Sequence, residues 1–228
     1  MNTLLSLLNV NTTFFTILGY PMSYIEFFGT LLNLWTVWLV AKKKILNWPV
    51  GIAAVLLFGA LFYQLHLYAD FFEQIYYFIT GFIGWYIWYN SKPRDHKDDI
   101  VVKTNTKLAN IMWAIGIAIV SVLGGWCMAH IHIWLPALFP EPASLPLLDT
   151  ATTVMSFAAT ILMIQKKLEN WILWIAVDII GIWLYWYKGV PLVALLYVCF
   201  LGIATKGFFE WKRTLERSKH HETGTSDR

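Results

Sequence analysis

The chain has 228 residues, of which 58% are hydrophobic and only 14% charged, and 13 of them are tryptophans. A water-soluble core of this size could not bury so much apolar surface, so the composition excludes a soluble globular protein and indicates an integral membrane protein. The modest formal net charge of +3 gives little support to a nucleic-acid-binding function.

The first 20 residues contain an apolar run that polar residues interrupt at positions 9, 11, 12 and 13. No basic segment precedes the run and no persuasive small-residue cleavage site follows it, so a secretory signal peptide is not indicated. We expect a short N-terminal helix at the membrane interface or half buried in it, with an additional span as the alternative.

Seven further stretches predict membrane-spanning helices, because each has, or nearly has, the roughly 20 apolar residues needed to cross a bilayer. Cys127 and Cys199 both fall inside such stretches, where a thiol behaves as a small hydrophobic group, so we expect no disulfide framework. In chain order the predicted spans of this all-α integral membrane protein cover residues 22–41, 48–66, 70–90, 108–128, 147–165, 170–187 and 191–211.

One short sequence occurs twice, as KKILNW at Lys43–Trp48 and as KKLENW at Lys166–Trp171, 123 positions later. The repeated words have a structural interpretation: lysines reach the membrane interface, the asparagine caps the next helix, and the tryptophan anchors it. Because the same offset holds without a gap well outside these words, we interpret it as a duplication. It relates Glu26 to Asp149, Thr30 to Thr153, Gly84 to Gly207 and Trp88 to Trp211.

Each copy contains three predicted spans, and the single span at 108–128 separates the copies, so both triplets enter the membrane in the same direction. This is a 3+1+3 parallel repeat, a transporter design in which the substrate site lies near the bilayer midplane between the repeats. The predicted organisation is an N-terminal interfacial segment (1–20), a first three-helix repeat (21–90), a cytoplasmic loop, linker helix and outer loop (91–146), a second three-helix repeat (147–213) and a cytoplasmic tail (214–228).

The basic residues predict the orientation of the chain in the membrane. With seven spans, fifteen of the 17 Lys and Arg residues fall on one side, only Lys188 falls on the other, and Lys206 lies within the last span. Because Lys and Arg beside a span are retained in the cytoplasm during insertion, we expect the N-terminus outside and the C-terminus inside.

Function is expected where the two copies differ. The offset pairs Asp178 with Val55, and Trp174 with Gly51. Asp178 lies in the middle of the sixth span, where an ionisable residue is costly unless it faces a cavity or a partner, so we predict a functional role for it. The structural alternative is an internal hydrogen bond, or an ion pair with Lys206 that only holds helices together.

Helical spacing gathers polar and aromatic residues on one face of two spans. Such faces, with one carboxylate and one amide, suit a flat, cationic or polar heterocycle, because rings stack on it and favour positive charge. On the sixth span the face consists of Trp171, Trp174, Asp178, Gly181 and Tyr185. On the third span it consists of Gln74, Tyr77, Gly81, Gly84, Trp85 and Trp88.

This chemistry serves binding, and neither an enzyme nor a cofactor is expected. No phosphate-binding loop, zinc-protease or hydrolase motif occurs, and the pair His130 and His132 has no third ligand for a metal. Two alternatives remain: a membrane enzyme using Asp178 with Glu73 or His66 as acid and base, and a receptor that binds its ligand without transporting it.

Three stretches resemble signatures of the PnuC-type vitamin transporters, and the resemblance covers residues 22 to 211. They are QIYYFITGFIGWYIW at Gln74–Trp88, WILWIAVDIIGIWLY at Trp171–Tyr185 and KGVPLVALLY at Lys188–Tyr197. The resemblance implies a SWEET-like 3+1+3 fold, a homotrimer, and a carrier for nicotinamide riboside in the bacterial inner membrane. It further implies facilitated diffusion, with a cytoplasmic riboside kinase that prevents escape of the substrate. Sister subgroups handle thiamine or riboflavin, which remain alternative substrates.

The resemblance also implies a set of substrate-binding residues on the two polar faces. They are Gln74, Tyr77, Trp85 and Trp88 on the third span, and Trp174, Asp178 and Tyr185 on the sixth. We add Tyr197 and Asn33 to this predicted set.

Overall fold

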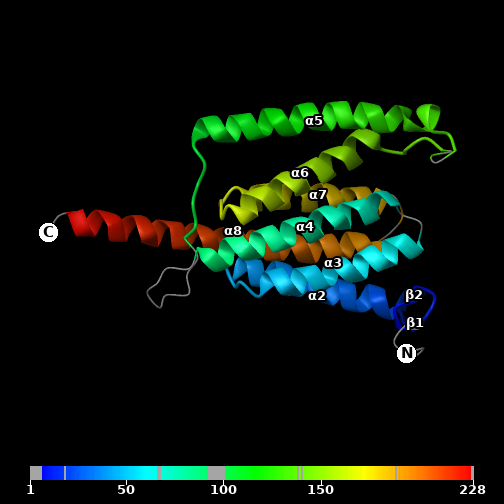
Figure 1. Cartoon of the computed structure of the whole chain (residues 1–228), viewed down its shortest axis with the longest axis horizontal. Coiled ribbons are helices and arrows are strands. Elements are labelled where there is room, and N and C mark those ends of the chain that lie inside the picture. Colours follow the sequence, from blue (N-terminus) through cyan, green and yellow to red (C-terminus); the bar gives the residue numbers. More distant parts are fainter. Residues whose placement is uncertain are drawn as a thin grey trace. The chain divides into compact units, whose positions relative to one another are not determined.

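The computed structural model of the chain describes residues 7–17, 19–65, 68–91, 101–137, 139, 141–187, 189 and 191–226. The chain divides into two compact units, residues 1–100 and 101–228, and each unit has its own set of packed helices (Figure 1). The boundary falls between the first predicted repeat and the predicted linker helix.

The first unit contains a β-hairpin and three long helices. Strands β1 (Thr13–Ile17) and β2 (Tyr20–Ser23) pair antiparallel through a turn at Gly19, whose φ of +83° is a left-handed conformation that glycine adopts without strain. In this unit α2 packs on α3, and α3 packs on α4. The three helices are α2 (Tyr24–Ala41), α3 (Asn47–Gln64) and α4 (Tyr68–Asn90).

The hairpin stands where a short N-terminal helix was expected. The sequence of β1, TFFTI, consists of β-branched and aromatic residues, which favour a strand over a helix. The ring of Phe14 packs against Tyr24 and Phe27 of α2 at centroid distances of 4.5 and 5.3 Å. Ser23 then caps α2 by accepting a hydrogen bond from the backbone N–H of Glu26. The short helix predicted within residues 1–20 was therefore wrong for residues 13–17 and 20, and residues 1–6 and 18 lie outside the described part of the chain.

The second unit consists of four helices in its described residues, each packed on the next. Thr106 caps α5 by accepting from the N–H of Ala109 at 3.2 Å, and Pro146 opens α6 at a position where its missing N–H costs no hydrogen bond. The helices are α5 (Lys107–Trp134), α6 (Pro146–Ile164), α7 (Asn170–Tyr187) and α8 (Pro191–Ser226).

Six of the seven long helices in the described chain are long and apolar enough to cross a membrane. The remaining one, α4, has sufficient length at 23 residues, but Asp70, Glu73 and its many tyrosines and tryptophans lower its hydropathy. The observed helix ends lie within two residues of the predicted span ends, apart from the C-terminal ends of α5 and α8. The all-helical membrane architecture is confirmed for these elements.

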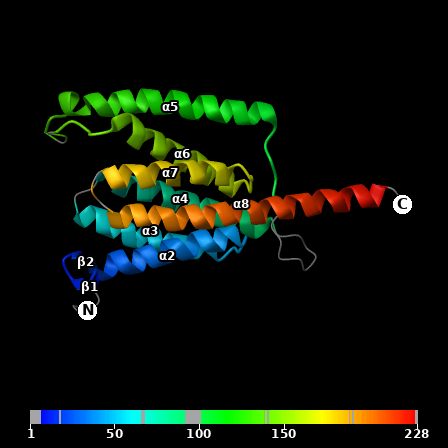
Figure 2. The ribbon, with the colours of Figure 1, turned by 180° about the vertical axis from the view of Figure 1, so that it is seen from behind.

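Helix α8 continues to Ser226, well beyond the predicted end of the last span (Figure 2). Lys212 and Glu216 lie one turn apart at 4.0 Å, and neither proline nor glycine occurs between Gly207 and Gly224. Outside the membrane, polar residues carry no penalty, so helix-forming residues extend the helix. The residues predicted as a separate tail after 213 therefore belong to the same helix up to its end.

The turns that contain the repeated KKxxNW words adopt the same conformation in both units. Lys43 and Lys166 both have positive φ, at 57° and 61°, and the side-chain amides of Asn47 and Asn170 each donate to the carbonyl oxygen three residues earlier. The asparagine thus closes the turn instead of capping the next helix, which corrects the predicted role of this residue.

Each repeated tryptophan lies over a glycine of the helix packed beside it. A Cβ atom at Gly84 would approach the Trp48 ring to 2.1 Å, and one at Gly207 would approach the Trp171 ring to 2.6 Å. Each unit therefore contains the same buried pair of indole rings, called here the indole base, and only glycine leaves room for the rings. Edge-to-face pairs form between Trp48 and Trp88 (centroids 5.3 Å apart, 88°) and between Trp171 and Trp211 (5.6 Å, 86°).

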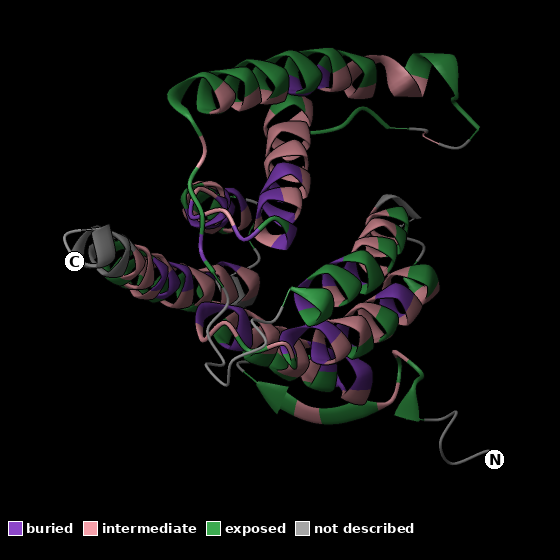
Figure 3. Cartoon of the chain, turned by 60° about the vertical axis from the view of Figure 1, so that its left-hand side comes forward, coloured by how far each residue is buried: buried purple, intermediate pink, exposed green. Residues whose placement is uncertain are grey.

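Apolar side chains cover much of the outer surface of both units. Figure 3 shows α5 exposed along most of its length, and among its residues only Ser121 and Gly125 are buried. At Gly125 the helix approaches α6 so closely that a Cβ atom would lie 2.8 Å from the Leu147 backbone. An apolar helix surface of this extent is suited to contact with lipid.

The indole packing generates a stability prediction. We expect Gly207→Ala to destabilise the protein by about 1–3 kcal/mol, because its methyl group must displace the buried Trp171 ring. The matched control is Gly202→Ala on the same helix, where nothing lies within 4 Å of the new Cβ atom. Thermal unfolding of the purified variants in detergent measures both effects, and equal midpoints would contradict the proposed packing role.

Candidate functional site

Asp178 is the central residue of the candidate site in the second unit. It lies in the middle of α7 with only 4% of its surface exposed. Among the described residues it has neither a hydrogen-bond nor an ion-pair partner, and Lys206 of α8 does not pair with it. The predicted structural role, an internal bond that only holds helices together, therefore lacks support within this unit.

Close packing of α7 on α8 forms the surroundings of this carboxylate. Gly181, one turn after Asp178, lies against the ring of Tyr197 from α8, which a Cβ atom at this position would approach to 2.5 Å. The ring of Tyr197 stacks on that of Tyr185, with centroids 5.3 Å apart and planes 21° apart. Asp178 and Tyr185 thus lie two turns apart on α7, and Tyr197 of α8 stacks on Tyr185.

Trp174 precedes Asp178 by one turn on α7. Its indole is half buried, and unlike the indole of Trp171 it makes no ring contact within the described chain. A large aromatic surface without an aromatic partner remains available for a ligand. The structure therefore places four predicted residues on one α7–α8 pair: Trp174, Asp178, Tyr185 and Tyr197.

The corresponding positions of the first unit carry different chemistry. The offset of 123 places Val55 at the position of Asp178. Phe58 and Phe62 stack at 5.8 Å with planes 17° apart, where the second unit has Gly181 and Tyr185. The first unit is thus apolar where the second has a carboxylate and phenols, although their tryptophan bases are alike.

Four predicted residues lie on α4, and two of them, Gln74 and Tyr77, are polar. Tyr77 donates its hydroxyl hydrogen to Glu73 Oε1 at 3.0 Å, and the Gln74 amide makes only a long contact of 3.5 Å to the Asp70 carbonyl oxygen. Glu73 was absent from the predicted binding set, although its spacing of four residues before Tyr77 is the signal that could have identified it. Gln74 and Tyr77 are half buried, and the Gln74 amide has only its long contact to the backbone, so it retains hydrogen-bonding capacity for a ligand.

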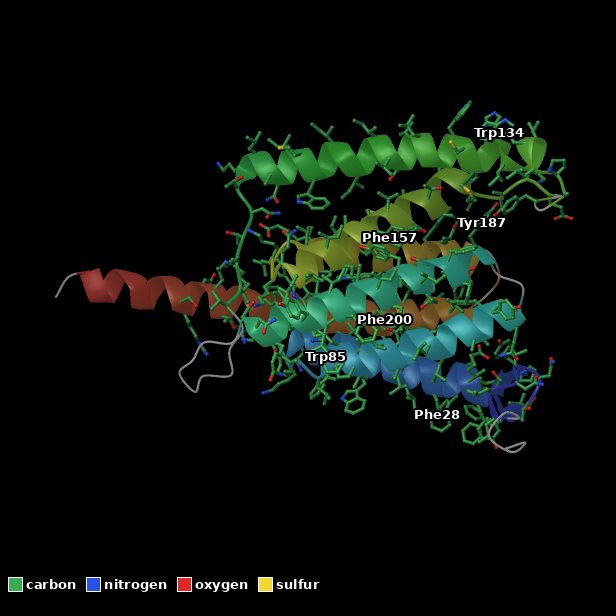
Figure 4. All side chains as sticks on the ribbon, in the orientation of Figure 1. Phe28, Trp85, Trp134, Phe157, Tyr187 and Phe200 are labelled. Carbon is green, nitrogen blue, oxygen red and sulfur yellow. The ribbon has the colours of Figure 1, made fainter. Side chains whose placement is uncertain are left out.

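The two tryptophans of α4 have different surroundings. Trp85, labelled in Figure 4, is half buried and lines an open hollow of about 340 Å³ with Phe82, Tyr86 and Tyr89. Trp88 has no exposed surface and packs on Trp48, so within this unit it belongs to the indole base. Both remain predicted ligand contacts, but within the first unit only the Trp85 side chain is partly exposed.

The remaining residues singled out in the sequence are Asn33, the histidines and Lys188. Asn33 is half buried on α2 and has no hydrogen-bond partner in the described chain. No group of three His, Cys, Asp or Glu side chains in the described residues could hold a metal ion, and the His130 ring bonds to the Trp126 carbonyl oxygen. His66 and Lys188 lie outside the described residues.

The chain is similar to transporters of known name. The profile of the nicotinamide mononucleotide transporter family matches residues 23–213. The nicotinamide riboside transporter PnuC of Escherichia coli is 30% identical over 208 residues, which cover 85% of this chain and 87% of the relative. The riboflavin/roseoflavin transporter RibM of Streptomyces davaonensis is 24% identical over 205 residues, covering 89% and 91%. A crystal structure of the vitamin B3 transporter PnuC superposes with a TM-score of 0.65 at 26% identity, covering 85% and 83% of the two chains.

The isolated carboxylate makes a prediction about stability. Because Asp178 has no partner in the described chain, Asp178→Asn breaks no observed bond and removes a group that is costly to bury in its charged form. We expect an unfolding midpoint equal to or above that of the unsubstituted protein.

The control is Asp149→Asn, in the first turn of α6, where the negative charge favours the helix N-terminus. This variant is expected to lose about 0.3–1 kcal/mol. A drop for Asp178→Asn larger than that of the control would show that the carboxylate holds helices together.

Proposed function

The chain belongs to the nicotinamide mononucleotide transporter family, and from this premise we propose that it carries nicotinamide riboside across the bacterial inner membrane. The observation that supports this substrate most directly is the buried, unpartnered Asp178 beside aromatic rings, in a chain similar to several nicotinamide riboside transporters. As members of a transporter family, such chains move their substrate without converting it.

Nicotinamide riboside is a cationic pyridinium ring that carries a polar sugar. In our proposal the Asp178 carboxylate balances the pyridinium charge, and the indole of Trp174 stacks on the ring. Tyr185 and Tyr197 contribute phenol rings and hydroxyl groups beside the carboxylate. A cation that enters such a place supplies the partner that Asp178 lacks, so binding energy comes from relieving an unfavourable burial.

We also propose polar residues of the first unit as substrate contacts. Gln74 can donate and accept hydrogen bonds, Asn33 has the same capacity, and Tyr77 carries a hydroxyl group. Trp85 is proposed to extend the aromatic surface, and Trp88 acts through the position of α4 rather than through exposed surface of its own.

The mechanism we propose is facilitated diffusion followed by trapping. The carrier has a 3+1+3, SWEET-like arrangement of its seven helices, works as a homotrimer, and exposes its site alternately to the two sides. Its N-terminus is outside and its C-terminus inside. A cytoplasmic riboside kinase then phosphorylates the substrate, whose added negative charge prevents its return, so accumulation needs no coupled ion.

A second substrate class is favoured by one specific comparison. The similarity to the riboflavin/roseoflavin transporter extends over nearly the whole chain, at lower identity than that to the nicotinamide riboside transporters. Riboflavin is neutral, so a flavin carrier would use Asp178 only as a hydrogen-bonding group. Thiamine is cationic, and the carboxylate alone does not separate it from nicotinamide riboside.

Binding measurements test the assigned residues. We expect Asp178→Asn and Trp174→Ala each to weaken nicotinamide riboside binding by about tenfold to a hundredfold, the loss expected for a charge-assisted contact or a buried aromatic one. The control is Val55→Thr, which changes the matched position of the first unit. Isothermal titration calorimetry on purified protein gives the three constants, and equal affinity in all of them refutes the assignment.

Uptake experiments test substrate and energetics together. In liposomes that contain the protein alone, radiolabelled nicotinamide riboside should reach equal concentrations inside and outside. In liposomes that also enclose a riboside kinase and ATP, the label should accumulate. Unlabelled riboflavin and thiamine serve as competitors, and stronger competition by riboflavin than by nicotinamide riboside would favour the flavin carrier. Accumulation above equilibrium without kinase would contradict facilitated diffusion.

A further inference from the structure

The segment before α5 is bound to the turn between α6 and α7 within the second unit. In backbone hydrogen bonds, Lys103 donates its N–H to the Lys166 carbonyl oxygen and accepts from the N–H of Leu168, both at 2.9 Å. Two side chains of the turn add further bonds: Lys167 Nζ donates to the Thr104 carbonyl oxygen at 3.0 Å, and Glu169 Oε1 accepts from the Asn105 N–H at 2.8 Å.

This attachment brings basic groups together at one end of the helices. Lys166 is only 7% exposed, whereas Lys103 is exposed at the edge of the same contact. Burial, and then the charge of Lys103, lower the pKa of the Lys166 ammonium. In the described chain neither lysine has an ion-pair or side-chain hydrogen-bond partner. The stem of Lys166 is thus largely buried, whereas its ammonium group still reaches solvent and has no acceptor in the described chain.

The nearby acid does not compensate these charges. Glu169 holds the Asn105 N–H with one carboxylate oxygen, and its other oxygen has no hydrogen-bond partner. No ion pair forms between Glu169 and either lysine. The corresponding residue of the first unit is Leu46, and the matched lysine, Lys43, is less buried than Lys166 in a turn of the same conformation.

We propose that Lys103 and Lys166 bind the phosphate group of an anionic ligand at the membrane surface. Two ammonium groups without a carboxylate between them match a phosphate, which offers several acceptor oxygens and at least one negative charge. The exposed Lys103 provides the entrance and the buried Lys166 the inner contact. The phosphate belongs either to an anionic lipid headgroup or to a soluble phosphate compound, and both sources present the same group.

Occupancy of this site has a structural consequence. A bound phosphate neutralises the repulsion between the two lysines and so strengthens the hold of residues 103–105 on the α6–α7 turn. The ligand therefore stabilises the folded chain by mass action, because the unfolded chain does not assemble the site.

Purified full-length protein in a maltoside detergent, which contains no phosphate, provides the test. One arm titrates sodium phosphate, the second titrates phosphatidylglycerol, and sodium chloride at equal ionic strength is the control for screening. Thermal unfolding midpoints and titration calorimetry are measured for the unsubstituted protein and for Lys166→Met and Lys103→Gln. Lys166→Met changes a buried residue and could impair folding. Lys103 is exposed, so we expect Lys103→Gln to fold, and this variant tests the proposal by itself. Lys43→Met is the matched control in the first unit.

We expect at least one phosphate-bearing probe to raise the midpoint beyond the effect of chloride. The Kd of that probe should rise about tenfold or more in Lys103→Gln and in Lys166→Met, and stay unchanged in Lys43→Met. A response to phosphatidylglycerol alone identifies a lipid headgroup, and a response to sodium phosphate identifies a soluble anion. Equal constants in all variants, or no response beyond chloride in the unsubstituted protein, overturn the proposal.

Discussion

The hydrocarbon interior of a membrane offers no hydrogen bonds, so a buried carboxylate such as that of Asp178 is costly unless it has a partner. A charged aspartate at the centre of a membrane helix costs about 2.5–3.5 kcal/mol on insertion scales, a large share of the roughly 5–15 kcal/mol by which proteins are stable. In the described chain no partner offsets that cost, and the neighbouring Tyr185 and Tyr197 stack on each other. A residue with such an insertion cost is expected where a ligand binds it, and Asp178 is therefore the central residue of the proposed function.

The glycine and tryptophan packing explains how the two units can differ at this position without losing their fold. Trp48 over Gly84 and Trp171 over Gly207 use the same contact, and the preceding turns share one conformation. Because this indole base packs the helices together in each unit, the position two turns after the tryptophan can be Val55 in one unit and Asp178 in the other. Residues that are identical in the two units thus form the shared packing, and the proposed ligand contact at Asp178 lies where the units differ.

Sequence periodicity was sufficient to predict the helices, because the need to cross a bilayer leaves a long apolar signal. It failed at the β-hairpin of residues 13–17 and 20–23, where local strand preference and the turn at Gly19 outweigh the apolar run. It could not show that Trp88 is fully buried or that Asp178 has no partner, since both depend on how helices are rotated against their neighbours. The match of Trp88 with Trp211 was nevertheless a sequence signal for packing, whereas the difference between Val55 and Asp178 is the basis of the functional prediction, which remains a prediction.

The most direct test of this account is the water accessibility of position 178. In a background with Cys127→Ser and Cys199→Ser, Asp178→Cys is reconstituted in liposomes and treated with a membrane-impermeant thiosulfonate reagent. The account predicts that the new thiol reacts, and that nicotinamide riboside slows the reaction at concentrations high enough to offset the weaker binding caused by loss of the carboxylate. A thiol that stays unreactive while a lipid-soluble maleimide modifies it would place the side chain in hydrocarbon and contradict the carrier site.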